Sequence, residues 1–137
     1  MKIFFDTNVY IADALLGKAA TRMIAATRRA RWRIYTSQYV LDEVLHVLVD
    51  ELEFSKRLAG LAQRRIIKQS ALVKVRSNAN VISDPKDSPI LQAALSCGAD
   101  YLISNDRHLL ALDPFEGLQI ISMDRYYSLL KQERWIE

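Results

Sequence analysis

The stretch KIFFDTN, residues 2–8, decides the fold class, because a short and wholly apolar run ends directly on the carboxylate of Asp6. A strand that is apolar throughout, instead of alternating, is typical of a parallel sheet covered on both faces. An aspartate costs several kcal/mol to bury unless its charge is compensated. Asp6 is therefore either the cap of the following helix or a ligand of a cation, and the residues alone leave both roles open.

Short apolar runs recur along the chain and alternate with helical patterns. Strands are expected at residues 2–5, 33–35, 72–75, 101–104 and 118–122. Helices are expected at 8–16, 19–30, 37 to about 54 with Ser37 as its cap, 55–70, 90–97 and from about 125. The alternation predicts an α/β fold, namely a three-layer α/β/α sandwich around a central parallel sheet of about four to five strands. Since no linker or repeat interrupts the 137 residues, we expect one domain over residues 1–137.

Composition excludes several classes of protein. No apolar run approaches the roughly 18 residues that cross a bilayer, and the N-terminus has no basic region before an apolar stretch, so we expect a cytoplasmic protein with no membrane partner. The single cysteine, Cys97, excludes an internal disulfide, and the presence of only two histidines argues against a zinc site. The net charge of +3 favours a polyanionic partner without establishing one.

Several acids follow expected strands, and the carboxyl ends of parallel strands meet at one edge of the sheet, where sites form in such folds. Asp6 and Asp106 each follow a strand, so both emerge at this edge. Asp100 precedes its strand and lies at the opposite edge, roughly 16 Å or more away at about 3.3 Å per residue. Asp100 is therefore excluded from the site.

The turn before the helix at residues 90–97 supplies a third candidate. Pro89 keeps Ser88 out of the helical region, so Ser88 is the expected N-cap, and Asp87 is free for another role. Asp84 precedes a proline and is expected to organise the turn. The helix from residue 37 supplies a fourth acid.

That fourth acid is either Asp42 or Glu43, and helical periodicity does not decide between them, because both fall just outside the apolar arc of the helix. Three or four carboxylates at one edge raise one another's pKa values unless a cation is present. Ligand sets made of oxygen alone suit Mg²⁺ or Mn²⁺. Such an ion activates water and orients a phosphodiester for hydrolysis.

Basic residues cluster where the acids do not. Arg28, Arg29, Arg31 and Arg33 surround Trp32. The cluster is either a nucleic-acid contact, with guanidinium groups on phosphates and the indole on a base, or a solvated helix end whose arginines favour the helix dipole. The sequence leaves both interpretations open.

Four blocks in this order carry a family resemblance: FFDTNVYIADALL (4–16), SQYVLDEVLHVL (37–48), ISDPKDSPILQAAL (82–95) and ADYLISNDRHLLAL (99–112). Together they cover nearly the whole chain and resemble the PIN domain, and within it the VapC-like toxins of bacterial and archaeal toxin–antitoxin pairs and a neighbouring family of toxin PIN proteins. The resemblance implies a Mg²⁺- or Mn²⁺-dependent endoribonuclease. It also implies an RNA substrate, a cognate antitoxin and a homodimer. A housekeeping RNA-processing nuclease and an inactive PIN-fold binding module are the alternatives.

The resemblance assigns roles to individual residues of this sequence. The residues that it implies as metal-binding and catalytic are Asp6, Glu43, Asp87 and Asp106, which decides between Asp42 and Glu43. Asn8, Ser104 and Asp84 match positions that support the site. Lys86 and Arg107 lie beside two of the acids and are candidates for holding the RNA backbone. Asn105 stands where many members have glycine, which makes the shape of the loop before Asp106 a point of difference.

Overall fold

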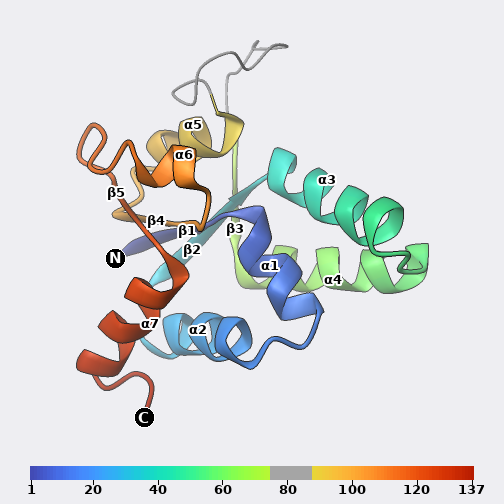
Figure 1. Cartoon of the computed structure of the whole chain (residues 1–137), viewed down its shortest axis with the longest axis horizontal. Helices are drawn as coiled ribbons and strands as arrows, with labels where there is room; N and C mark the ends of the chain where they lie inside the picture. The colour runs from blue at the N-terminus through green and yellow to red at the C-terminus, as the bar shows by residue number, and fades with distance from the viewer. Residues whose placement is uncertain (75–87) are drawn as a thin grey trace.

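The structure is a computed structural model that describes residues 1–74 and 88–137. Within these residues, five strands form one parallel sheet in the order β3-β2-β1-β4-β5 (Figure 1). The strands are β1 (Lys2–Phe5), β2 (Arg33–Ser37), β3 (Ala71–Val73), β4 (Tyr101–Ile103) and β5 (Gln119–Ile121). The predicted α/β fold with a central parallel sheet is confirmed.

Helices cover both faces of this sheet. They are α1 (Thr7–Ala14), α2 (Lys18–Arg29), α3 (Gln38–His46), η1 (Val47–Glu51), α4 (Lys56–Gln69), α5 (Pro89–Ser96), α6 (Arg107–Leu110) and α7 (Met123–Gln132). Figure 1 shows α5 and α6 on one side of the sheet and α1, α2, α4 and α7 on the other. Helix α2 packs against α1 and α7, while α5 packs against β2 and β4. The arrangement is the expected three-layer sandwich.

The strand order contains one reversal of direction, and this reversal positions the site. From β1 the chain moves outward to β2 and then to β3, after which it returns to the other side of β1 as β4 and continues to β5. The two helical connections therefore diverge between β1 and β4. In open parallel sheets such a switch point leaves a crevice at the carboxyl ends of the strands, where ligands bind.

The central strand β1 explains why the apolar run 3–5 is continuous. Ile3, Phe4 and Phe5 are all fully buried, because helices lie above and below them. The Phe5 ring meets Tyr10 of α1 and Tyr126 of α7 edge to face, with 5.9 Å between ring centroids in each pair. These contacts fix both helices on the sheet. In the part of the chain that the structure describes, no helix has the length and apolarity needed to cross a membrane.

Side-chain caps set where most helices begin. Serine hydroxyls accept a backbone N–H at the start of α3, α4, α5 and α7, from Ser37, Ser55, Ser88 and Ser122. The predicted caps at Ser37 and Ser88 are confirmed, and Pro89 occupies the first turn of α5. At the other end of α5, Gly98 takes the left-handed φ of +68° that ends the helix.

Three of the differences between the structure and the sequence prediction concern α3, α6 and α7. The helix expected to run to about residue 54 changes at Val47 into the π-helical segment η1. Helix α7 begins at Met123 instead of about residue 125, because Ser122 is its cap. Helix α6 was not predicted, since four residues are too short to show a 3.6-residue period.

Candidate active site at the carboxyl edge of β1 and β4

The parallel register of β1 and β4 brings two polar residues together. Phe5 pairs with Ile103, and the next backbone amide, that of Asp6, donates to the Ile103 carbonyl at 3.0 Å. Asp6 and Ser104 therefore leave the sheet side by side. Both are buried, with exposed fractions of 4% and 0%.

Asp6 caps α1 with one carboxylate oxygen and accepts the Ser104 hydroxyl with the other. Its Oδ1 accepts the Thr7 amide at 2.6 Å, and its Oδ2 accepts the Ser104 hydroxyl at 2.6 Å. Burial raises the pKa of the Asp6 carboxyl, and the two hydrogen bonds oppose this rise. The charges of Glu43 and Asp106 raise the pKa further. Of the two roles that the sequence left open, the cap is confirmed by the Thr7 hydrogen bond, and the role as a ligand of a cation stays a prediction.

Asp106 is joined to Asp6 through one hydroxyl. The Asp106 amide donates to Ser104 Oγ at 3.0 Å, while that hydroxyl donates to Asp6. The Asp106 carboxylate caps α6, because its Oδ1 accepts the amides of His108 at 2.7 Å and Leu109 at 3.4 Å. The carboxylate is exposed. Ser104 therefore sets the spacing between a buried acid and a solvent-facing one.

Helix α3 places its two adjacent acids differently. Asp42 is exposed and accepts the Gln38 side-chain amide at 2.8 Å. Glu43 is half-buried, and its charge acts on Asp6. The structure thus brings Glu43, and not Asp42, into electrostatic contact with the acid at the end of β1.

Tyr39 is a neighbour of this group that the sequence reasoning missed. The pKa of the Tyr39 phenol is raised to about 12. Burial is the largest cause, and the hydrogen bond to the Glu43 carboxylate and the charges of Glu43 and Asp6 raise the pKa further. The hydroxyl donates to Glu43 and so orients that carboxylate. The signal was present in the sequence, because residues 39 and 43 are one helical turn apart.

The remaining predicted residues lie partly outside the described chain. Asp84, Lys86 and Asp87 fall within residues 75–87, which the structure does not describe. Asn8 is exposed in the first turn of α1, and no hydrogen bond joins its side chain to another described residue. Arg107 is exposed at the start of α6, next to Asp106 in the chain. The structure therefore places Arg107 close to an acid and leaves Asn8 in solvent.

The donor set fits a hard cation in its chemistry. Asp6, Glu43 and Asp106 offer only carboxylate oxygens, and their mutual repulsion is the kind that a divalent ion relieves. The Thr7 hydroxyl beside Asp6 is buried without a hydrogen-bond partner among the described residues. Within residues 1–74 and 88–137, however, no three His, Cys, Asp or Glu side chains are grouped closely enough to hold an ion. The described residues by themselves therefore do not form a metal site.

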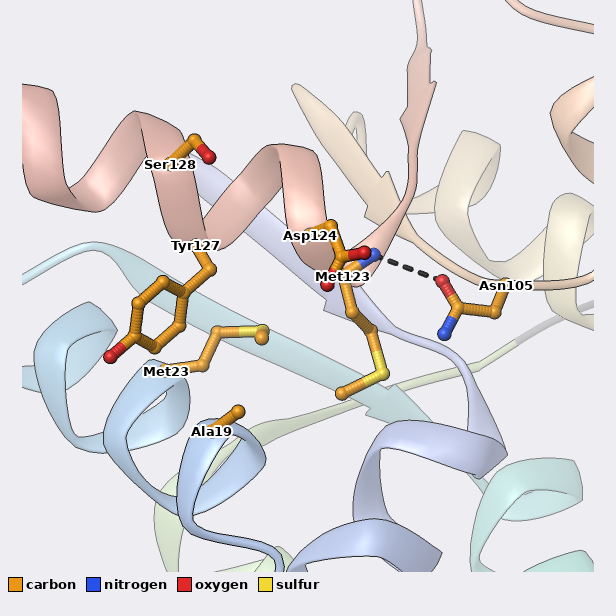
Figure 2. Close-up of a pocket in the computed structure, with 7 residues that line it drawn as sticks. All are labelled: Ala19, Met23, Asn105, Met123, Asp124, Tyr127 and Ser128. Carbon is orange, nitrogen blue, oxygen red and sulfur yellow. Dashed lines mark hydrogen bonds between the residues drawn. The ribbon is translucent and has the colours of Figure 1, made fainter.

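A pocket of about 390 Å³ adjoins the loop that carries Asp106. Its lining residues, drawn in Figure 2, are Ala19, Met23, Asn105, Met123, Asp124, Tyr127 and Ser128. Asn105 Oδ1 accepts the Met123 amide at 3.1 Å. Asn105 thus ties the loop before Asp106 to the first turn of α7, a fixed geometry that glycine could not supply.

Comparison with known protein families agrees with this geometry. The family model described as PIN domain matches residues 2–108. The chain therefore belongs to the PIN domain family, and the resemblance seen in its four sequence blocks is confirmed. No curated protein and no solved structure matches the chain. PIN domains are generally nucleases that act on RNA and use divalent metals.

Proposed function

We propose that this protein is a metal-dependent endoribonuclease that hydrolyses RNA phosphodiesters. The observation that carries the proposal is the hydrogen-bonded chain Asp6–Ser104–Asp106 at the switch point of the sheet, with the Glu43 charge acting on the same buried carboxylate. Acids held this close are costly to stability, and they persist in proteins where they serve chemistry.

Each residue of the proposed site has a role. Asp6 and Asp87 hold the main Mg²⁺ or Mn²⁺ ion, and Asp106 completes its ligand set. When bound, the ion supplies Lewis acidity toward water and the scissile phosphate. Glu43 orients the attacking water or binds a second ion, and the Tyr39 hydroxyl fixes the direction of its carboxylate.

Other residues support the acids and hold the substrate. Ser104 fixes the distance between Asp6 and Asp106. Asn8 and Asp84 support the site, as the resemblance implies. Arg107, exposed beside Asp106, and Lys86 hold the RNA backbone. In-line attack of water on the phosphorus breaks the P–O3′ bond, and the O3′ oxygen takes up a proton, so the products are a 5′-phosphate and a 3′-hydroxyl.

We further propose that the protein is the toxin of a toxin–antitoxin pair. It would act in the cytoplasm as a homodimer, and a cognate antitoxin would inhibit it. The support is the likeness of its four blocks to VapC-like toxins. One PIN domain would span residues 1–137, since β5 and α7, beyond the matched region, pair with β4 and pack on α2. Induced expression should arrest growth, and the Asp6→Asn protein should not.

The test of the nuclease proposal is cleavage of a labelled single-stranded RNA with Mg²⁺, with Mn²⁺ and with EDTA. Wild-type protein should cleave only with metal, whereas Asp6→Asn should not cleave. Asp106→Asn is a second variant, because asparagine caps a helix as well as aspartate does. The matched control is Asp100→Asn, whose carboxylate accepts the Lys2 amide at 2.7 Å at the opposite edge of the sheet.

Circular dichroism and thermal melting of each variant separate loss of chemistry from loss of folding. If both site variants are folded and cleave like wild type, the proposed site is wrong. If folded wild-type protein binds no metal and cleaves no RNA, the inactive binding module is the better description.

A further inference from the structure

A pocket of about 370 Å³ lies at the edge of the sheet opposite the acids, where α2 and α4 end and β2 and β3 begin. We call it the basic pocket. The residues that line it include four cations and one indole: Arg28, Arg31, Arg33, Lys68 and Trp32. Register fixes its place, because Arg33 pairs with Lys2 at the start of β1, whereas Asp6 follows the end of that strand.

None of the cations of the basic pocket is neutralised by a described residue. Ion pairs within residues 1–74 and 88–137 join His46 to Asp50 and Arg65 to Asp13, and none of these side chains lines the pocket. The one arginine of the cluster outside the pocket, Arg29, instead donates to the Trp135 carbonyl at 2.7 Å. The positive charge of the pocket is therefore available to an anion from outside.

The helix dipole explains only part of this charge. Arg28 and Lys68 lie in the last turns of α2 and α4, where cations favour the helix end. Arg31 and Arg33 lie beyond both helices. Arg31 has the left-handed φ of +60°, which costs a side-chain-bearing residue roughly 1–2 kcal/mol. That turn brings the chain round so that residues 28, 31 and 33 line one pocket.

We propose that the basic pocket is a second RNA-binding site, which holds phosphates of single-stranded RNA while Trp32 stacks on a base. The inference rests on the proposed ribonuclease function and extends it to the far edge of the sheet. Guanidinium groups bind phosphate oxygens in pairs, and an indole beside such groups is the usual platform for a base of any identity. The pocket would add affinity without sequence preference.

The distance between the two sites makes the inference specific. β2 runs from Arg33 at the basic pocket to Ser37 at the acid edge, which is roughly 13 Å at about 3.3 Å per residue. An RNA of about two nucleotides, with one step of roughly 3.4 Å when stacked, reaches one site only, while a longer strand reaches both. The basic pocket should therefore affect binding of long RNA and leave cleavage of short RNA unchanged.

The test is binding of labelled RNA of about 20 nucleotides, compared with a labelled RNA of about two, measured by fluorescence anisotropy in EDTA over a range of salt concentrations. The triple variant Arg28→Gln/Arg33→Gln/Lys68→Gln should weaken binding of the long RNA at least about tenfold. Its slope of log K against log salt should fall by about 2, since each phosphate contact of a single strand contributes about 0.7. Cleavage of the short RNA with metal should stay at the wild-type rate.

A control variant removes the same charge elsewhere. Lys56→Gln/Arg57→Gln/Lys131→Gln changes three exposed cations that do not line the basic pocket. It should keep wild-type affinity and salt slope. If the two triple variants weaken binding equally, general charge is responsible and the inference is wrong. Because binding is measured in EDTA, a protein that cleaves nothing still gives a decisive result on the basic pocket.

The indole provides an independent readout. The sequence has two tryptophans, so Trp135→Phe leaves Trp32 as the sole indole emitter. RNA should quench its emission, whereas inorganic polyphosphate should compete for the pocket without quenching. Poly-glutamate tests the other class of occupant. If poly-glutamate binds as tightly as RNA and RNA leaves Trp32 emission unchanged, the pocket is a site for an acidic polypeptide and the inference fails.

Discussion

At the scale of single residues, Ser104 is the side chain on which the proposed site depends most. It is fully buried, donates to Asp6 and accepts the Asp106 amide, so its one hydroxyl contacts both acids. A residue that positions two acidic groups acts on chemistry without touching the substrate. Partners of this kind typically change activity by 10- to 100-fold, which is about the range expected here.

Ser104→Ala should therefore lower the rate of RNA cleavage by about 10- to 100-fold. It should also cost about 1–3 kcal/mol in the free energy of unfolding, because buried polar groups lose a partner. Cleavage assays and urea denaturation measure the two effects. Ser96→Ala is the matched control, since that hydroxyl is exposed and donates to the Gln92 carbonyl of its own helix at 2.7 Å. Wild-type cleavage by a folded Ser104→Ala protein would remove its positioning role.

The hydroxyls of the buried Tyr126 and Tyr10 differ in their hydrogen bonding, so their removal should affect stability differently. The Thr27 hydroxyl donates to the Met23 carbonyl at 2.8 Å, so the Tyr126 hydroxyl is the donor in its 2.5 Å bond to Thr27. The Tyr10 hydroxyl is buried without a partner among the described residues. Tyr126→Phe should lower the free energy of unfolding by about 1 kcal/mol, whereas Tyr10→Phe should leave it unchanged or raise it. Urea midpoints at unchanged m-value measure both, and a larger loss for Tyr10→Phe would contradict the assignment.

At the scale of elements, side-chain caps place both acids of the carboxyl edge. Asp6 and Asp106 each follow a strand and begin a helix, so the strand-to-helix turns that build the fold also present the carboxylates. The caps at Ser37 and Ser88 could be predicted from sequence because capping depends on neighbours in the chain. The joining of Asp6 to Ser104 could not, since 98 residues separate them.

Two glycines show how neighbouring elements constrain a helix. A Cβ at Gly17, between α1 and α2, would lie 2.7 Å from the Ala12 carbonyl oxygen, whereas a Cβ at Gly60 inside α4 meets nothing within 4 Å. Gly17→Ala should lower the free energy of unfolding by about 1–3 kcal/mol, and Gly60→Ala should raise it by about 0.5–1 kcal/mol. Parallel urea denaturation measures both. If the two substitutions change the free energy of unfolding equally, helix propensity alone accounts for both and the close approach at Gly17 has no effect.

At the scale of the whole molecule, the buried tyrosines predict how stability changes at alkaline pH. Burial raises the pKa of both Tyr10 and Tyr126 above the ordinary value of 10.0. The folded state therefore holds these protons when the unfolded state has lost them. The contribution of the two tyrosines to the free energy of unfolding is fully present below pH 10. It is lost as pH rises above 10, on the order of 1 kcal/mol per pH unit for each tyrosine. The free energy of unfolding, measured from pH 8 to about 11, should decrease above pH 10.

The double variant Tyr10→Phe/Tyr126→Phe is the control for that fall. It should have a flatter pH dependence above pH 10, because phenylalanine has no proton to lose. An unchanged slope in the double variant would assign the alkaline loss of stability to other groups.

The sequence by itself determined the α/β class, the five strand positions and the serine caps of α3 and α5, because these depend on local pattern and on neighbours in the chain. The resemblance supplied the family and the choice of Glu43. Only the tertiary structure decided that the Asp6 carboxylate accepts the Ser104 hydroxyl, that the Glu43 charge acts on Asp6, and that the cations of the basic pocket converge. Those features arise from the register of β1 with β4 and from the packing of helix ends, which join residues far apart in the chain.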